Sequence, residues 1–180
     1  MTTTTTGIPP VLTVATDGGC NPNPGPGGWA WVAEEPAPGE PARYGAGSFR
    51  KTTNNIAELT AIKEVLLAFP DTALTIEFDS QYAKKCVTEW GPNWRRQGEA
   101  VWSTKKNVDL IFEIIDLLEA RTAAVFWRKV KAHARDNRHP LNTAVDKLAS
   151  RMSSIRGDTR EEGTVLIDRE LRGAASRARH

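Results

Sequence analysis

The chain has 180 residues, of which 39% are hydrophobic and 26% charged, and this is typical of one globular domain with a full-sized core. No apolar run is long enough to span a bilayer, and the first ten residues lack the basic and apolar regions of a secretion signal, so we expect a cytoplasmic protein that enters no membrane. The two cysteines, Cys20 and Cys86, exclude a disulfide framework and show no zinc-binding pattern with the histidines. We interpret both as reduced, packed thiols.

The formal net charge of +2 hides an asymmetry along the chain. Residues 1–80 contain four Lys/Arg and nine Asp/Glu, whereas residues 81–150 contain thirteen Lys/Arg and eight Asp/Glu. Such a division is typical of a protein that binds cations with one part of its surface and a polyanion with another. Charge alone identifies neither ligand.

The N-terminal half predicts a disordered lead, three strands and a helix. Residues 1–10 are Thr-rich and lack a core pattern, which predicts the disordered lead. Short Gly/Pro/Glu-rich connections separate the strand-like runs and favour an antiparallel meander. Apolar residues then recur at helical spacing from Asn54 until Pro70 ends the helix. The three strand-like runs are Val11–Thr16, Trp29–Ala33 and Tyr44–Phe49.

The second half alternates helices with strands. In chain order we expect a strand at Ala73–Phe78, helices at Ser80–Trp90 and Val108–Leu118, a strand at Ala123–Val130 and a helix at Leu141–Met152. The Gly91-Pro92 pair should break the first of these helices. Residues 154–180 are polar and weakly patterned, which predicts a mobile basic tail. The whole order predicts an α/β fold: a five-stranded mixed sheet, three strands antiparallel and two parallel, flanked by helices.

Four carboxylates stand at privileged points of this plan. Asp17 and Asp79 each end a predicted strand, and their tips are neighbours if these strands pair in parallel. Glu58 and Asp146 lie in the predicted first turns of two helices, and each taken singly suits a capping or helix-dipole role. Asp17 and Asp79, taken singly, likewise suit turns and caps. If the four converge, their repulsion calls for a cation, and Mg²⁺ prefers such oxygen ligands. Two such ions about 4 Å apart can activate water and stabilise a leaving oxygen in phosphodiester hydrolysis.

Residues 90–107, WGPNWRRQGEAVWSTKKN, interleave tryptophans with cations. Cations here would gain affinity by releasing counterions from phosphates, and indoles can pack against sugars or brace the loop. The alternative is a solvated helix–loop–helix whose tryptophans fill the core.

Six motifs, in order along the chain, resemble those of the type 1 ribonuclease H family. They are TDGGCNPNPGPGGWAW, TTNNIAELTAI, DSQYAKKCVTEW, NWRR, KNVDL and VKAHARDNRHPLNTAVDKLA. The ordered set is far more specific than any single motif. The resemblance covers about Val11 to Arg151 and implies a ribonuclease H-like catalytic domain over residues 11–153.

The resemblance implies an endonuclease that cleaves the RNA strand of RNA–DNA hybrids, leaving 5′-phosphate and 3′-hydroxyl ends, with two Mg²⁺ ions per site or Mn²⁺ as a substitute. Asp17, Glu58, Asp79 and Asp146 resemble the family's metal-binding carboxylates, and Glu58 also resembles a contact to a ribose 2′-hydroxyl. His133 resembles the mobile histidine that assists proton transfer or product release, with His139 in the same loop as a competitor.

The resemblance also implies how the hybrid is bound. Residues 90–107 resemble the basic handle that grips the DNA strand, and we call them the handle. The matching contacts to nucleic acid are Asn23, Thr53, Asn54, Asn55, Gln81, Trp90, Trp94, Arg95, Arg96, Lys105 and Lys106. We expect a monomer without an obligate protein partner that removes RNA primers and R-loops.

Two other functions stay open from the sequence. A DNA nuclease or strand-transfer enzyme on a related fold would share the clustered acids, but it gives no reason for TTNN, Glu58 and a tryptophan-rich handle to occur together. A non-catalytic hybrid-binding module would tolerate the loss of an acid, whereas all four are present.

Overall fold

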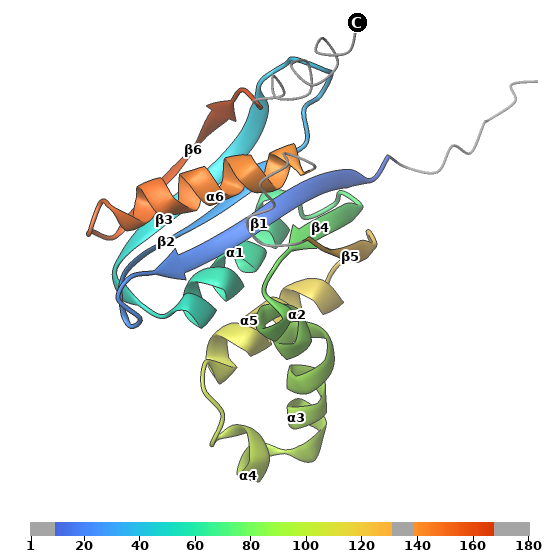
Figure 1. The fold of residues 1–180 in the computed structure, drawn as a ribbon. Helices are drawn as coiled ribbons and strands as arrows, with labels where there is room; N and C mark the ends of the chain where they lie inside the picture. The colour runs from blue at the N-terminus through green and yellow to red at the C-terminus, as the bar shows by residue number, and fades with distance from the viewer. Residues whose placement is uncertain (1–9, 131–138, 168–180) are drawn as a thin grey trace, which may run out of the picture.

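The structure, a computed structural model, describes residues 10–130 and 139–167, so residues 1–9 of the predicted lead and 168–180 of the predicted tail lie outside it. One mixed sheet has the strand order β5-β4-β1-β2-β3-β6 (Figure 1). Within the described ranges no helix has the length and apolar character needed to cross a bilayer. The strands are β1 (Leu12–Cys20), β2 (Gly25–Ala33), β3 (Ala42–Thr52), β4 (Leu74–Phe78), β5 (Val125–Lys129) and β6 (Thr159–Val165).

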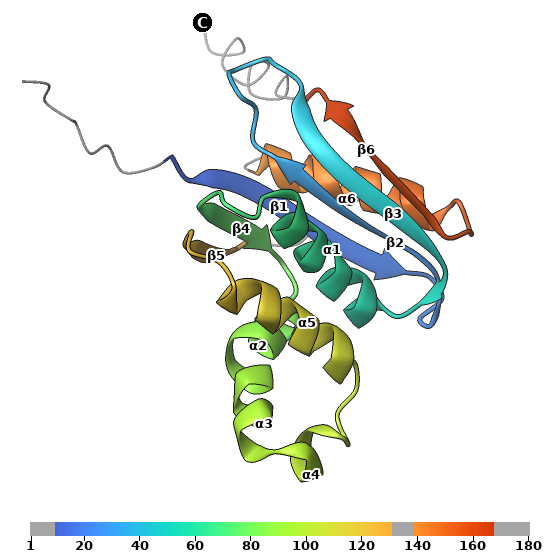
Figure 2. The same ribbon diagram turned by 180° about the vertical axis from the view of Figure 1, so that it is seen from behind.

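Helices cover both faces of the sheet, as the α/β expectation requires. Helices α1 and α5 lie on one face and α6 lies on the other (Figures 1 and 2). Successive side chains of β1 point to opposite faces of the sheet. Val14 therefore packs in the core with residues of α1 and α5, and Ala15 packs in the core with residues of α6. The helical segments are α1 (Asn54–Ala68), α2 (Gln81–Lys85), the π-helical turn η1 (Cys86–Trp90), α3 (Gly91–Gln97), α4 (Glu99–Trp102), α5 (Val108–Glu119) and α6 (Pro140–Ser153).

The predicted strand pairing is confirmed. The three N-terminal strands β1, β2 and β3 form the antiparallel meander, and β4 and β5 continue the sheet in parallel with β1. The sheet is therefore mixed, with the change from antiparallel to parallel pairing falling at β1.

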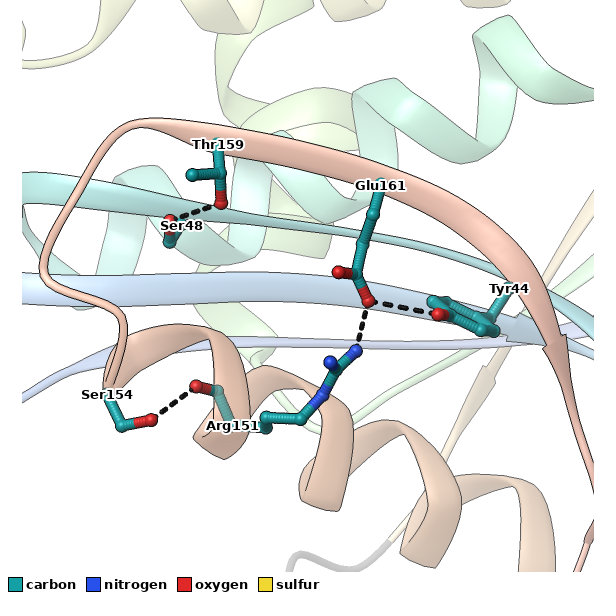
Figure 3. Close-up of polar contacts among 6 residues, drawn as sticks. All are labelled: Tyr44, Ser48, Arg151, Ser154, Thr159 and Glu161. Atoms are coloured by element: carbon teal, nitrogen blue, oxygen red, sulfur yellow. Dashed lines mark hydrogen bonds and ion pairs between the residues drawn. The ribbon is translucent and has the colours of Figure 1, made fainter.

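The sheet has six strands rather than the predicted five. Strand β6 arises from residues predicted to be a mobile tail and pairs antiparallel with β3. Figure 3 shows why it binds there: Glu161 accepts a 2.9 Å hydrogen bond from the Tyr44 hydroxyl and forms an ion pair with Arg151 of α6, while the Ser48 and Thr159 hydroxyls lie 2.6 Å apart. Because TREEGTV is almost entirely polar, no apolar period marks this strand in the sequence.

The helix that begins at Gln81 does not break at Gly91-Pro92, contrary to the sequence expectation. In the π-helical turn η1 the Gly91 N–H donates to the Cys86 carbonyl, five residues back, and α3 follows directly. Pro92 is the second residue of α3 and has no N–H to donate, so one backbone hydrogen bond is missing where η1 runs into α3. The chain therefore continues in helical form into the handle, which projects away from the sheet (Figures 1 and 2).

Candidate active site

The parallel register of β1 and β4 brings Asp17 and Asp79 together. Ala15 pairs with Glu77, so Asp17 and Asp79 each lie two residues further along neighbouring strands. Strand β4 ends at Phe78, whereas β1 runs on with β2 as its partner. Asp17 thus lies inside β1 rather than at its end, beside the point where β4 stops.

Glu58 reaches the same point because α1 packs unusually close to β1. A Cβ added to Gly18 would lie 2.4 Å from the carbonyl carbon of Ala57 and 2.6 Å from the amide nitrogen of Glu58, distances that only a residue without a side chain permits. Gly18 directly follows Asp17 on β1. The missing side chain therefore sets the approach of Glu58 to the strand that carries Asp17.

The capping alternatives for Glu58 and Asp146 are wrong. Helix α1 is capped by Thr53, whose hydroxyl accepts a 3.3 Å hydrogen bond from the Ile56 amide. Neither α1 nor α6 has an acidic residue in its first turn. Because α6 begins at Pro140, Asp146 lies in its second turn.

The four predicted carboxylates line one open cleft of about 490 Å³, which we call the carboxylate cleft. Asp17, Glu58 and Asp79 each offer one carboxylate oxygen within 4.8 Å of the other two. Asp146 lines the cleft from α6, on the opposite side of the sheet from α1, but does not belong to this tight group.

Small residues that sequence reasoning missed hold α6 beside the cleft. A Cβ on Gly28 would lie 2.4 Å from the Ala149 carbonyl oxygen, so α6 sits directly on the backbone of β2. The Ser153 hydroxyl donates hydrogen bonds to the Ala149 carbonyl oxygen at 3.1 Å and to the Gly19 carbonyl oxygen of β1 at 3.4 Å. Ser150 and Ser153 also line the cleft. The small residues Ala149, Ser150 and Ser153, which follow Asp146 within two turns of the same helix, are the signal that could have revealed this contact.

The electrostatics of the cleft fit a hard divalent cation. Burial raises the pKa of the Glu58 carboxyl well above its ordinary value, and the charges of Asp17 and Asp79, with a hydrogen bond to Asp79, raise the pKa further. None of the described residues that line the cleft is basic. A group of carboxylate oxygens at this spacing is the donor set that Mg²⁺ and similar ions prefer.

We expect Glu58→Gln to stabilise the protein in a chelator. Folding raises the pKa of Glu58 above its ordinary value of 4.5. At pH 7 the unfolded chain carries this carboxylate charged at no cost, whereas the folded protein does not, so Glu58 lowers the free energy of unfolding. This loss of stability disappears as the pH falls below the ordinary value. The amide removes this loss, and urea unfolding at pH 7 should show a gain of about 1 kcal/mol or more. Added Mg²⁺ should then stabilise the wild type more than the variant. A variant less stable than wild type in the chelator would contradict the repulsion.

Asn23 and Asn54, two of the predicted contacts to the nucleic-acid backbone, lie next to each other beside the cleft. The Asn54 side-chain oxygen accepts a 2.8 Å hydrogen bond from the Cys20 amide, and the Asn23 side-chain oxygen accepts a 3.3 Å bond from the Asn54 amide. These bonds tie the β1–β2 connection to the start of α1. Asn55 is exposed in the same first turn, and Gln81 is exposed at the start of α2, two residues beyond Asp79.

A row of aromatic rings, each tryptophan with an ammonium group over it, runs from α2 into the handle. The rings of Trp90 and Trp94 stack with centroids 6.5 Å apart, and Tyr82 meets Trp90 edge-on at 6.0 Å. The ammonium groups of Lys85 and Lys105 lie 5.8 and 5.6 Å from the Trp90 and Trp94 centroids. Trp90 is 39% exposed, whereas Trp94 is partly buried against the core.

The four predicted cations of the handle differ in their surroundings. Arg96, Lys105 and Lys106 are exposed. Arg95 is instead drawn onto α5, where it forms ion pairs with Asp116 and Glu119. The structure therefore separates Arg95 from the other three cations.

The two histidine candidates fall in different places. His133 lies outside the described residues. His139 precedes α6 and lines a separate pocket with Glu34, Glu77 and Arg128, not the carboxylate cleft.

Comparisons with known proteins identify the family. The family model described as RNase H matches residues 9–154. A ribonuclease HI of Streptomyces coelicolor is 43% identical over 147 residues, and a ribonuclease H of Methylorubrum extorquens is 41% identical over 160; the matches cover 78% and 85% of this chain but 61% and 65% of those proteins. A ribonuclease H of Tropheryma whipplei is 39% identical over 142 residues, which cover 77% of this chain and 81% of that protein.

Solved structures agree with the sequence comparison. The crystal structure of LC9-RNase H1, a type 1 ribonuclease H with the type 2 active-site motif, superposes with a TM-score of 0.72 at 26% identity, covering 93% of this chain and 82% of that one. Ribonuclease H1 of Halobacterium salinarum shares the fold, with a TM-score of 0.59 at 22% identity over 81% of this chain and 99% of that one. From the match of the family model to most of its length and from its curated relatives, the chain belongs to the type 1 ribonuclease H family.

Proposed function

We propose that this protein is an endoribonuclease that hydrolyses the RNA strand of RNA–DNA hybrids and leaves 5′-phosphate and 3′-hydroxyl ends. The observation that carries the proposal is the convergence of Asp17, Glu58 and Asp79 within 4.8 Å in an open cleft that Asp146 also lines. Only the fold brings these acids together, and their repulsion has no evident benefit to stability. Such a cluster is expected where a reaction needs cations.

In this proposal Asp17, Glu58, Asp79 and Asp146 hold two Mg²⁺ ions, for which Mn²⁺ can substitute. Bound ions of this kind supply Lewis acidity, which lowers the pKa of an attacking water and offsets the charge of a leaving oxygen. Glu58 also accepts a hydrogen bond from a ribose 2′-hydroxyl, the group that distinguishes RNA from DNA. His133 takes up or releases a proton near neutral pH.

The rest of the binding surface follows from the same proposal. Asn23, Thr53, Asn54 and Asn55 contact the sugar-phosphate backbone of the hybrid around the cleft, and Gln81 contacts its minor groove. The handle binds the DNA strand with Trp90, Trp94, Arg96, Lys105 and Lys106, whose cations release counterions from phosphates. Residues 11–153, whose sheet is completed by β6, form the catalytic domain of a cytoplasmic monomer that acts on RNA primers and R-loops.

Incubation with labelled duplexes tests the proposal. We expect loss of the RNA label only in an RNA–DNA hybrid and only when divalent metal is present, with RNA–RNA and DNA–DNA duplexes left intact. Cleavage of the DNA–DNA duplex would indicate a DNA nuclease instead. Binding of the hybrid without cleavage at any metal concentration would indicate a non-catalytic binding module.

A further inference from the structure

Arg95 is the handle cation whose surroundings differ from what a phosphate contact requires. Its guanidinium lies 2.8 Å from a carboxylate oxygen of Asp116 and 3.5 Å from one of Glu119, and it donates a 3.2 Å hydrogen bond to the Phe112 carbonyl. Its side chain is 33% exposed. With two carboxylates this close, the charge of Arg95 is largely cancelled at the range of a phosphate.

Phe112 makes this contact a junction between three helices. The Arg95 guanidinium carbon lies 4.5 Å from the centroid of the Phe112 ring, and the Trp102 ring of α4 meets the same ring edge-on at 5.7 Å. Helices α3 and α4 thus both rest on one residue of α5. The guanidinium combines stacking, a carbonyl and two carboxylates, a set that lysine cannot reproduce.

A second contact fixes the start of α3 on the same helix. A Cβ on Gly91 would lie 2.7 Å from side-chain atoms of both Ile111 and Ile115. Helix α3 therefore touches α5 at Gly91 and again, one turn later, at Arg95. These two contacts together fix the orientation of α3 on α5, whereas a single contact would let α3 rotate about it.

We propose that Arg95 is a positioning residue that fixes the handle on α5 through Phe112 and Asp116, and that it does not itself bind nucleic acid. The proposal rests on the proposed function, because its consequence is the affinity for the hybrid. We call the contacts of Arg95 with Phe112 and Asp116 the brace. With the brace in place, the handle presents Arg96, Lys105 and Lys106 in one fixed orientation. Without it, the three charges remain but are spread over several orientations.

The brace predicts a change in KM for Asp116→Ala that is opposite in sign to the change expected from charge alone. Removing an acid beside a polyanion site should strengthen binding, yet Asp116→Ala should raise KM about three- to tenfold, with kcat within about twofold of wild type, because it releases Arg95. Arg95→Ala should raise KM equally. The double variant should be no worse than either single one, since both remove the same contact.

Salt dependence and a control acid separate the brace from a phosphate contact. Arg95→Ala should leave the slope of log KM against log salt unchanged, whereas Arg96→Ala should reduce it by about one. Asp109→Ala, which removes another exposed acid of α5, should leave KM unchanged or lower. A reduced slope for Arg95→Ala, or a KM for Asp116→Ala at or below that of wild type, would overturn the proposal.

Amide hydrogen exchange tests the brace without any substrate. Exchange in residues 91–102 should quicken in Arg95→Ala and Asp116→Ala but not in Arg96→Ala or Asp109→Ala. Equal protection in all four variants would refute the brace even if the enzyme cleaves hybrids. Failure of the wild type to bind or cleave a hybrid, with the exchange difference present, would instead refute the proposed function alone.

Discussion

Asp79→Asn is expected to abolish metal-dependent cleavage while leaving the fold intact. Asp79 directly follows the last residue of β4, and it lies in the tight carboxylate group with Asp17 and Glu58. The amide keeps the shape of the side chain but removes a charge that holds the cations. Loss of several kcal/mol of transition-state stabilisation corresponds to a decrease in kcat of about a thousandfold or more.

Asp71→Asn is the matched control for this variant. Asp71 is an exposed acid just before the other end of β4, away from the cleft, and its loss should leave kcat unchanged. Asp17→Asn should behave like Asp79→Asn, and urea unfolding should show that both variants remain folded. Substantial Mg²⁺-dependent cleavage by either variant would remove that residue from the metal site.

Gly18→Ala should damage both stability and activity. The added methyl would lie 2.4 Å from backbone of α1, which cannot move aside as a flexible side chain could. Helix α1 must then shift away from β1, at a cost of about 3 kcal/mol, or roughly 6–12 °C in Tm. The shift carries Glu58 away from Asp17, so kcat should fall even in the fraction that stays folded.

Gly19→Ala provides the control at the next residue of the same strand. Its nearest neighbour to an added Cβ is the Asn54 side-chain oxygen at 3.7 Å, an ordinary contact. Thermal unfolding and cleavage assays on the two variants should therefore differ sharply. Equal stability of Gly18→Ala and Gly19→Ala would show that the approach of α1 is not set by Gly18.

Local patterns in the chain were enough for most elements of the fold. Alternation and helical periodicity depend on near neighbours, which is why the strands with Val14 and Phe78 and the helix beginning at Asn54 are close to their expected positions. The ordered family motifs pointed to the four acids. Strand β6 escaped detection because polar partners on β3 and α6, rather than an apolar period, hold it in place.

The details of the site depend on contacts between distant segments. Asp17 lies within β1 because β1 pairs with β2 beyond the end of β4, and Arg95 pairs with an acid 21 residues away on α5. No local preference reports such distances, since each depends on how closely two elements can approach. The residue types needed for the chemistry are thus readable along the chain, whereas their convergence into one cleft and the bracing of the handle arise only when Gly18, Gly28 and Gly91 let helices press against their neighbours.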